Sequence, residues 1–145
     1  MQPFVYDKAK YHAETIEEFG LPEEHAANHT VFFLRWLIER RLMSALFETD
    51  GADIVRAFRA GDASIHALYD WWDRCLIDDM LSDEGNAFAQ RYFDFERGSY
   101  LKDYARTLQR DLPSEFHVPF TEQNYQAIRA VIDQRYADWR RVSRP

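Results

Sequence analysis

The sequence has little cysteine, no excess of basic charge and no long hydrophobic run. Its one cysteine, Cys75, excludes a disulfide framework and a zinc site built from cysteine side chains. No apolar segment approaches the roughly 20 residues that a membrane-spanning helix requires. Hydrophobic residues make up 46% of the chain, with only 5 Gly and 5 Pro, which excludes a disordered or low-complexity protein. A length of 145 residues therefore predicts one domain, over residues 1–145.

The charge of the chain is acidic, with 25 Asp and Glu against 18 Lys and Arg and a formal net charge of −7. Proteins that bind nucleic acid or an anionic membrane surface need a basic patch, so this charge argues against both partners. It permits a basic protein partner, because opposite fields speed association, although solubility alone explains it equally well. The N-terminal segment lacks the apolar stretch of a secretory signal, which predicts a cytoplasmic location.

Nearly every periodic stretch has the spacing of a helix, so we expect an all-α fold, a single-domain bundle of about six or seven helices. The predicted helices cover residues 7–18, 23–44, 51–60, 64–80, 82–97, 99–112 and 121–139. The segment 31–38 is apolar on almost all sides, which is typical of a buried helix, and it is expected to form the centre of the bundle. No stretch alternates as a strand joined by a hairpin turn would.

Local signals predict helix ends and core positions. Asp7, Asp50 and Thr121 are interpreted as N-caps of the helices that follow them. Cys75 lies on an apolar stripe beside Trp72 and is interpreted as a small core residue. The side chains expected to be buried are Phe33, Leu34, Leu37, Ile132 and Tyr136.

The strongest candidate for metal chemistry is the pair His25 and His29, which share one face of a helix at a spacing of i and i+4. His12 is a possible third ligand. No carboxylate has the spacing known from zinc proteases or di-iron bundles, since Ala26 stands where both motifs place Glu. We therefore expect partly buried histidines, with no bound metal, no cofactor and no catalytic residue. The alternative is a metal-dependent helical-bundle enzyme that uses His12, His25 and His29.

Acidic residues gather in two stretches of the sequence, at Glu14–Glu24 and between Asp70 and Glu84. The second stretch holds six acids against one base, Arg74, and includes Trp71. An aromatic side chain at the edge of an acidic face has the composition of an interaction hot spot, although a solvated face is the simpler alternative. The candidate partner-binding residues are Asp70, Trp71, Asp73, Asp78, Asp79, Asp83 and Glu84.

Several segments of the sequence, taken together, resemble a known protein family, although each segment alone is a weak signal. They are YDKAKYH at residues 6–12, LSDEGNAFA at 81–89, YLKDY at 100–104, FHV at 116–118 and the C-terminal positions Asn124, Tyr125, Ile132, Asp133 and Trp139. With them, the sequence resembles a family of small uncharacterised bacterial proteins of the toxin-immunity type. The resemblance implies an acidic cytoplasmic protein that is not an enzyme.

The function that the resemblance and the charge together predict is an immunity protein, which binds and occludes a cognate toxin domain. In this hypothesis the carboxylates between Asp70 and Glu84 meet a basic face of the toxin, with Trp71 as an anchor. The resemblance also singles out His12, Asn86 and His117 as polar residues that the fold does not require. They are either structural hydrogen-bonding groups or parts of one pocket.

Overall fold

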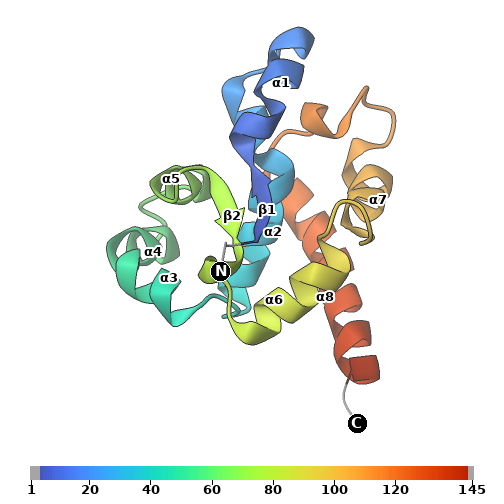
Figure 1. Cartoon of the computed structure of the whole chain (residues 1–145). Helices are drawn as coiled ribbons and strands as arrows, with labels where there is room; N and C mark the ends of the chain where they lie inside the picture. Colours follow the sequence, from blue (N-terminus) through green and yellow to red (C-terminus); the bar gives the residue numbers. More distant parts are fainter. Residues whose placement is uncertain (1–3, 144–145) are drawn as a thin grey trace.

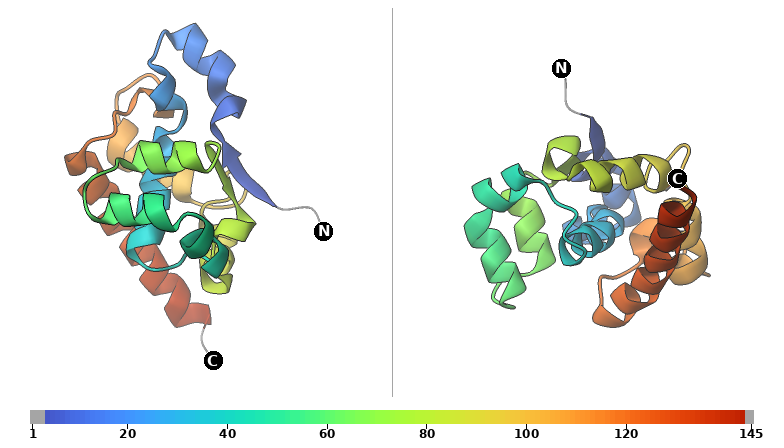
Figure 2. Two further views of the ribbon diagram at one scale, coloured as in Figure 1. Left: turned by 90° about the vertical axis from the view of Figure 1, so that its left-hand side faces the viewer. Right: turned by 90° about the horizontal axis from the view of Figure 1, so that it is seen from below.

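Helix α2 (Asn28–Glu39) runs through the centre of the computed structural model, which describes residues 4–143 (Figure 1). Every residue of α2 from Asn28 to Leu34 is buried, as are Trp36, Leu37 and Ile38. Seen from below, α2 lies between the group α3–α5 on one side and α7 with α8 on the other (Figure 2). The prediction of an all-α domain around a buried central helix is therefore confirmed.

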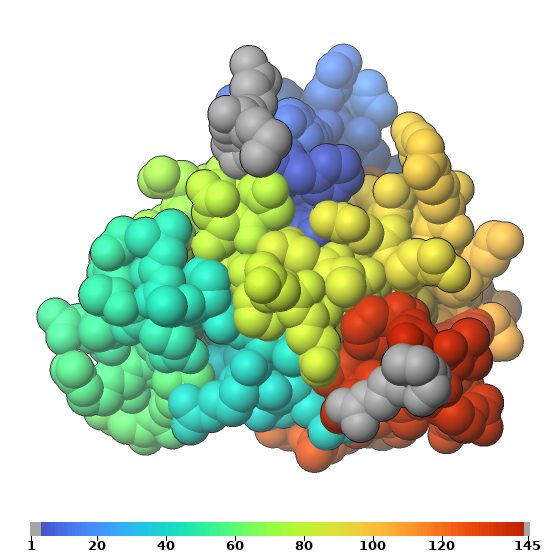
Figure 3. Space-filling view, turned by 60° about the horizontal axis from the view of Figure 1, so that its bottom comes forward, coloured from blue at the N-terminus to red at the C-terminus, as the bar shows by residue number. Residues whose placement is uncertain are grey.

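The other elements surround α2 in short segments. In chain order they are β1 (Val5–Lys8), η1 (Ala9–His12), α1 (Ala13–Phe19), η2 (Glu23–Ala26), α3 (Ala45–Asp50), α4 (Ala52–Arg59), α5 (Ile65–Trp71), β2 (Cys75–Ile77), η3 (Asp78–Met80), α6 (Asp83–Tyr92), α7 (Tyr100–Tyr104), η4 (Ala105–Gln109), η5 (Glu115–His117) and α8 (Glu122–Ser143). Helix α6 lies between the α3–α4 region and α8 on the face shown in Figure 3. No helix among the residues described is long and apolar enough to cross a membrane.

A small antiparallel sheet joins the N-terminal segment to the middle of the chain, which the sequence did not predict. Strand β1 pairs with β2, with Asp7 opposite Leu76 and Lys8 opposite Cys75. The predicted helix over 64–80 is wrong beyond Trp71, because the backbone turns out of the helix there and continues as β2 and η3. Leu76 and Met80 are still buried, but they reach the core from these other elements.

Two of the predicted caps are wrong. Asp7 lies within β1, and the first α-helix begins only at Ala13. Asp50 is the last residue of α3, a helix that was not predicted. Thr121 is a cap as expected, since its Oγ1 accepts a hydrogen bond from the backbone N–H of Asn124 at 3.0 Å. Cys75 is only half-buried on β2, so its assignment to the core is also wrong.

The core predicted from the sequence is confirmed, since all five of its expected residues are buried: Phe33, Leu34, Leu37, Ile132 and Tyr136. Aromatic rings fill much of the space around α2, and Phe33 stacks on Phe93 with ring centroids 4.6 Å apart. Helix α8 is fastened to α2 by a hydrogen bond from Trp36 Nε1 to Asp133 Oδ1 at 2.8 Å. This packing fixes the positions from which the polar side chains described next project.

Candidate functional site

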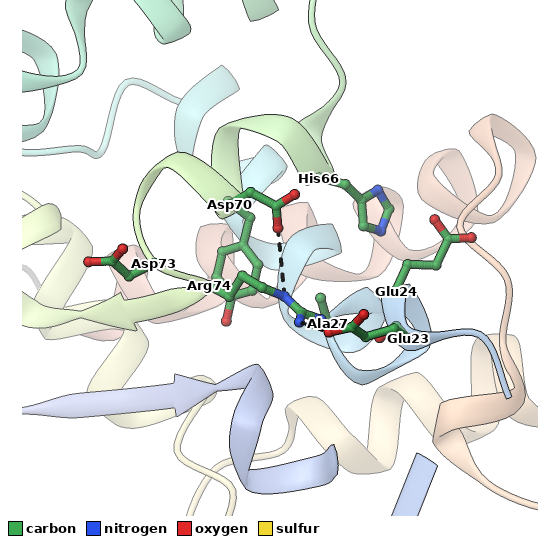
Figure 4. Close-up of a pocket in the computed structure, with 8 residues that line it drawn as sticks. Glu23, Glu24, Ala27, His66, Asp70, Asp73 and Arg74 are labelled. Carbon is green, nitrogen blue, oxygen red and sulfur yellow. Dashed lines mark hydrogen bonds and ion pairs between the residues drawn. The ribbon is translucent and has the colours of Figure 1, made fainter. Parts of the chain in front are cut away.

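An acidic hollow lies between η2, α5 and the turn that follows α5 (Figure 4). Its volume is about 550 Å³. The residues that line it are four carboxylates, one guanidinium and three others: Glu23, Glu24, Asp70, Asp73, Arg74, His66, Tyr69 and Ala27. The end of the first acidic stretch, at Glu23 and Glu24, therefore lies close to the start of the second, at Asp70 and Asp73. Sequence reasoning missed Glu23 and Glu24 as site residues, although their stretch is conspicuously acidic.

Arg74 joins the two sides of the acidic hollow. Its Nη1 donates to Glu23 Oε1 at 2.9 Å, its Nη2 donates to the backbone O of Glu23 at 3.2 Å, and its Nε lies 3.6 Å from Asp70 Oδ1. The φ angles of Asp73 and Arg74 are 59° and 54°, in a region that costs a non-glycine residue about 1–2 kcal/mol. This turn ends α5 and directs Arg74 into the hollow, at a backbone cost of the kind concentrated at functional segments.

Negative charge remains in excess in the acidic hollow after this pairing. All four of its carboxylate residues are exposed, and Arg74 supplies the one guanidinium that lines it. In Figure 4 the Asp73 carboxylate points away from Arg74, whereas Glu24 lies on the side of His66. Because exposed carboxylates without a counter-charge attract cations, the hollow can accept a basic group from a partner.

His66 is held in one tautomer at the edge of the acidic hollow. Its Nε2–H donates to the Asn28 side-chain oxygen at 2.7 Å, and the Asn28 amide in turn donates to the backbone O of Val118 at 3.1 Å. Burial lowers the pKa of His66 below its usual 6.5, against the opposite effect of Glu24 and Asp70. His66 is therefore a neutral, directional group beside the carboxylates.

Trp71, at the C-terminal end of α5, is exposed over 49% of its surface. Its ring packs edge-on against Trp72, with centroids 4.9 Å apart, and Trp72 stacks on Phe47 at 5.0 Å. Gly51 allows this close packing, since a Cβ at this position would lie 3.0 Å from the Trp72 ring and the ring would have to shift. Trp71 is thus a rigidly supported aromatic surface next to Asp70.

The remaining predicted partner-binding residues belong to another part of the chain, η3 and the start of α6. Asp79 and Asp83 are exposed there. Asp78 is partly buried, and its Oδ1 has no hydrogen-bond partner. Glu84 accepts a hydrogen bond from the Tyr136 hydroxyl of α8. None of these four lines the acidic hollow, so the structure divides the predicted set into two groups.

A second polar cluster is buried where β1, η1 and α2 meet. Nε2 of His12 lies 2.8 Å from Asp7 Oδ1, and Nε2 of His29 lies 3.2 Å from Asp7 Oδ2. The Thr30 hydroxyl donates to Asp7 Oδ2 at 2.6 Å. The side chains of Asp7 and His29 are 2% and 3% exposed, and that of His12 is 19% exposed. Sequence reasoning missed Asp7, which it interpreted as a helix cap.

Two opposing effects set the ionisation of Asp7. Burial alone would raise the pKa of its carboxyl, but hydrogen bonds from His12 and His29 and the charge of these rings outweigh burial. The pKa of Asp7 therefore lies well below its usual value of 3.8. The cluster holds an ionised carboxylate inside the protein, and the groups around it are donors or cations, as a buried anion requires.

The other polar residues that the sequence singled out are kept apart by the fold. His25 Nδ1–H donates to the backbone O of Phe116 at 2.6 Å and is not among the group of ligand atoms that includes His12 and His29. Asn86 accepts from the Tyr6 hydroxyl at 2.6 Å. His117 Nδ1 pairs with the Ser114 hydroxyl at 2.8 Å. His12, Asn86 and His117 thus have separate hydrogen-bond partners.

These features define a single-domain, mostly helical protein with an acidic hollow and a buried carboxylate–histidine cluster. The chain belongs to the family DUF7832, a domain of unknown function, whose family model matches residues 5–118. Both polar sites lie within the matched residues, and α8 lies beyond them. Comparisons with curated proteins and with solved structures gave no match. Membership of an uncharacterised family is confirmed, and the immunity role stays a prediction.

Proposed function

We propose that the chain is a non-catalytic immunity protein that binds a cognate bacterial toxin domain and covers a basic surface of that domain. The single observation that carries the proposal is the acidic hollow, where, among the described residues, four exposed carboxylates face one guanidinium. The family resemblance supplies the class of partner. The acidic hollow supplies the chemistry by which such a partner is recognised.

The mechanism is occlusion of the surface with which the toxin holds its own substrate. A basic side chain of the toxin enters the acidic hollow and pairs with Glu24 and Asp70, while Arg74 stays bound to Glu23. Trp71 packs against the partner beside this contact and excludes water from it. The carboxylates act mainly on the rate of association, and the tryptophan acts mainly on dissociation.

The proposed binding surface differs from the one predicted from the sequence: it gains residues of η2 and loses those of η3 and α6. Glu23 and Glu24 join Asp70 and Asp73 around the acidic hollow, and Trp71, which does not line it, follows Asp70 at the end of α5. Asp78 and Glu84 are left out of the proposed surface, because neither lines the acidic hollow and Glu84 is bound to Tyr136. Asp79 and Asp83 are exposed acids outside the acidic hollow and serve as matched controls.

Co-expression with the products of neighbouring reading frames tests the proposal. One of these products should be toxic alone, form a stable complex with the chain and lose its toxicity in that complex. The variant Glu24→Gln/Asp70→Asn should lose protection, whereas Asp79→Asn/Asp83→Asn removes the same charge elsewhere and should protect normally. Protection that survives the first variant but not the second would contradict the assignment of the surface. A set of neighbouring products among which none binds would contradict the immunity role itself.

A further inference from the structure

The buried cluster of Asp7, His12 and His29 has the composition of a metal site. Each residue offers one ligand atom, and the three atoms lie within 4.8 Å of one another. In a tetrahedral site with metal–ligand bonds of about 2.0–2.1 Å, the ligand atoms are about 3.3 Å apart. His12 Nε2 lies 2.8 Å from Asp7 Oδ1 and His29 Nε2 lies 3.2 Å from Asp7 Oδ2, so the carboxylate presents one oxygen to each histidine at about that separation. Two imidazoles and one carboxylate form the three-ligand set of metal sites that keep an open position.

The surroundings of the cluster also fit a metal site. The Thr30 hydroxyl binds Asp7 Oδ2 at 2.6 Å and so fixes the orientation of the carboxylate, as outer partners of metal ligands do. The Phe116 ring lies 5.1 Å from the His12 ring and 5.4 Å from the His29 ring, between centroids. His12 is 19% exposed, so the cluster reaches the surface of the protein at this ring.

His29 contributes its Nε2 to the cluster from the central helix. This atom lies 3.2 Å from Asp7 Oδ2, and the His29 side chain is 3% exposed. Its Nδ1 is buried and has no hydrogen-bond partner among the described residues, so Nε2 is the ring nitrogen that the cluster engages.

A carboxylate completes the ligand set of the cluster. The expectation of no metal rested on finding two histidines without a suitably spaced carboxylate. The fold supplies that carboxylate from β1.

We propose that Asp7, His12 and His29 bind one divalent transition-metal ion of the zinc type. The ion links the N-terminal segment Val5–His12 to α2, and its open position faces the partly exposed side of His12. This inference does not depend on the proposed toxin partner, because the acidic hollow contributes none of the three ligands.

Titration of the full-length chain with Zn²⁺ tests the inference. The protein is purified without a histidine tag, freed of metal and studied by calorimetry, and Co²⁺ serves as a spectroscopic probe of the same site. We expect one equivalent of Zn²⁺ per chain, a visible d–d band with Co²⁺, and a melting temperature that rises with the concentration of Zn²⁺.

Two variants make the test specific. His12→Gln keeps a donor for Asp7 Oδ1 at a partly exposed position, so the fold should survive, while Zn²⁺ affinity should fall by at least about 100-fold. His25→Gln changes a histidine outside the cluster and should leave the affinity within about threefold of the wild type. Circular dichroism verifies that both variants fold. Absence of saturable binding to the wild type, or equal loss of binding in both variants, would overturn the proposal.

Discussion

His29 Nε2 lies 3.2 Å from Asp7 Oδ2, and neither side chain is more than 3% exposed. This contact joins β1, which pairs with β2, to the central helix. Lys8 pairs with Cys75 in the adjacent strand, so the polar contact and the sheet hold the same segment from two sides. The N-terminal segment is therefore an integral part of the fold, and through β2 it is connected to the turn that forms the acidic hollow.

The central position of α2 predicts a large cost for truncating its core contacts. Leu37→Ala and Ile132→Ala should each lower the free energy of unfolding by about 2–5 kcal/mol, because both side chains are fully buried. Val142 lies on the same helix as Ile132 and is 79% exposed. Val142→Ala should therefore change the free energy of unfolding by less than about 0.5 kcal/mol. Urea denaturation measures all three. Equal effects of Ile132→Ala and Val142→Ala would contradict the packing of α8.

The lowered pKa of His66 predicts a dependence of stability on pH. Burial disfavours the charged imidazole, Arg74 and His25 add to this effect, and Glu24 and Asp70 oppose it. The unfolded chain therefore takes up a proton at a higher pH than the folded protein does. The contribution of His66 is fully present above its usual pKa of 6.5 and is lost as the pH falls below that value.

His66→Gln tests this dependence, because an amide can still donate to Asn28 but does not titrate. The free energy of unfolding should fall less in this variant than in the wild type between about pH 7.5 and about pH 5. Chemical denaturation at a series of pH values gives both curves. Parallel curves would show that His66 does not titrate differently in the two states.

The backbone conformation of Arg110 predicts that glycine at this position stabilises the protein. Its φ and ψ angles of 48° and −112° belong to a region that only glycine occupies without strain. Arg110→Gly should therefore raise the free energy of unfolding by about 1 kcal/mol. Lys102→Gly, at an exposed position inside α7, should lower it by about 1 kcal/mol. Thermal denaturation compares the two, and a loss of stability in both would contradict a strained backbone at Arg110.

The helices with clear periodicity and a polar start were predictable from the sequence alone. Thr121 is a cap as expected, and the apolar run at 31–38 is the buried centre. The sheet was not predictable, because β2 has only three residues and pairs with a segment far away in the chain. The prediction extended helix α5 through Leu76, because apolar residues continue at helical spacing. Nothing in the sequence indicated that Asp73 and Arg74, neither of which is glycine, adopt positive φ angles.

The candidate sites were predictable only in part, for the same reason. The sequence identified Asp70 and His29 by composition and spacing, but their partners come from distant segments. Glu24 and Asp70 line one hollow only in the folded chain, and Asp7 comes within 3.2 Å of His29 from a strand that pairs with β2. The residues of each candidate site come together through tertiary contacts. Sequence periodicity indicates only which face of a single helix or strand is apolar.

Trp71 predicts a contribution to the lifetime of the complex with the toxin. A supported and exposed tryptophan at an interface commonly contributes at least about 2 kcal/mol, so Trp71→Ala should increase the dissociation rate about 30-fold. The association rate should change little, because the substitution leaves every charge in place. Leu112→Ala shortens another exposed apolar side chain and should leave both rates unchanged. Surface plasmon resonance measures both rates. If Trp71→Ala dissociated as slowly as the wild type, Trp71 would not be part of the interface.

The most direct test of recognition by the acidic hollow is the association rate of the toxin with two double variants, measured at low and at physiological salt. Asp70→Asn/Asp73→Asn removes two charges from the hollow, and asparagine tolerates the positive φ of Asp73. Asp79→Asn/Asp83→Asn removes two charges from η3 and α6. The account predicts that the first variant associates about 10-fold more slowly at low salt and depends less on salt, while the second behaves as the wild type. Equal slowing in both variants, or slowing in the second alone, would contradict it.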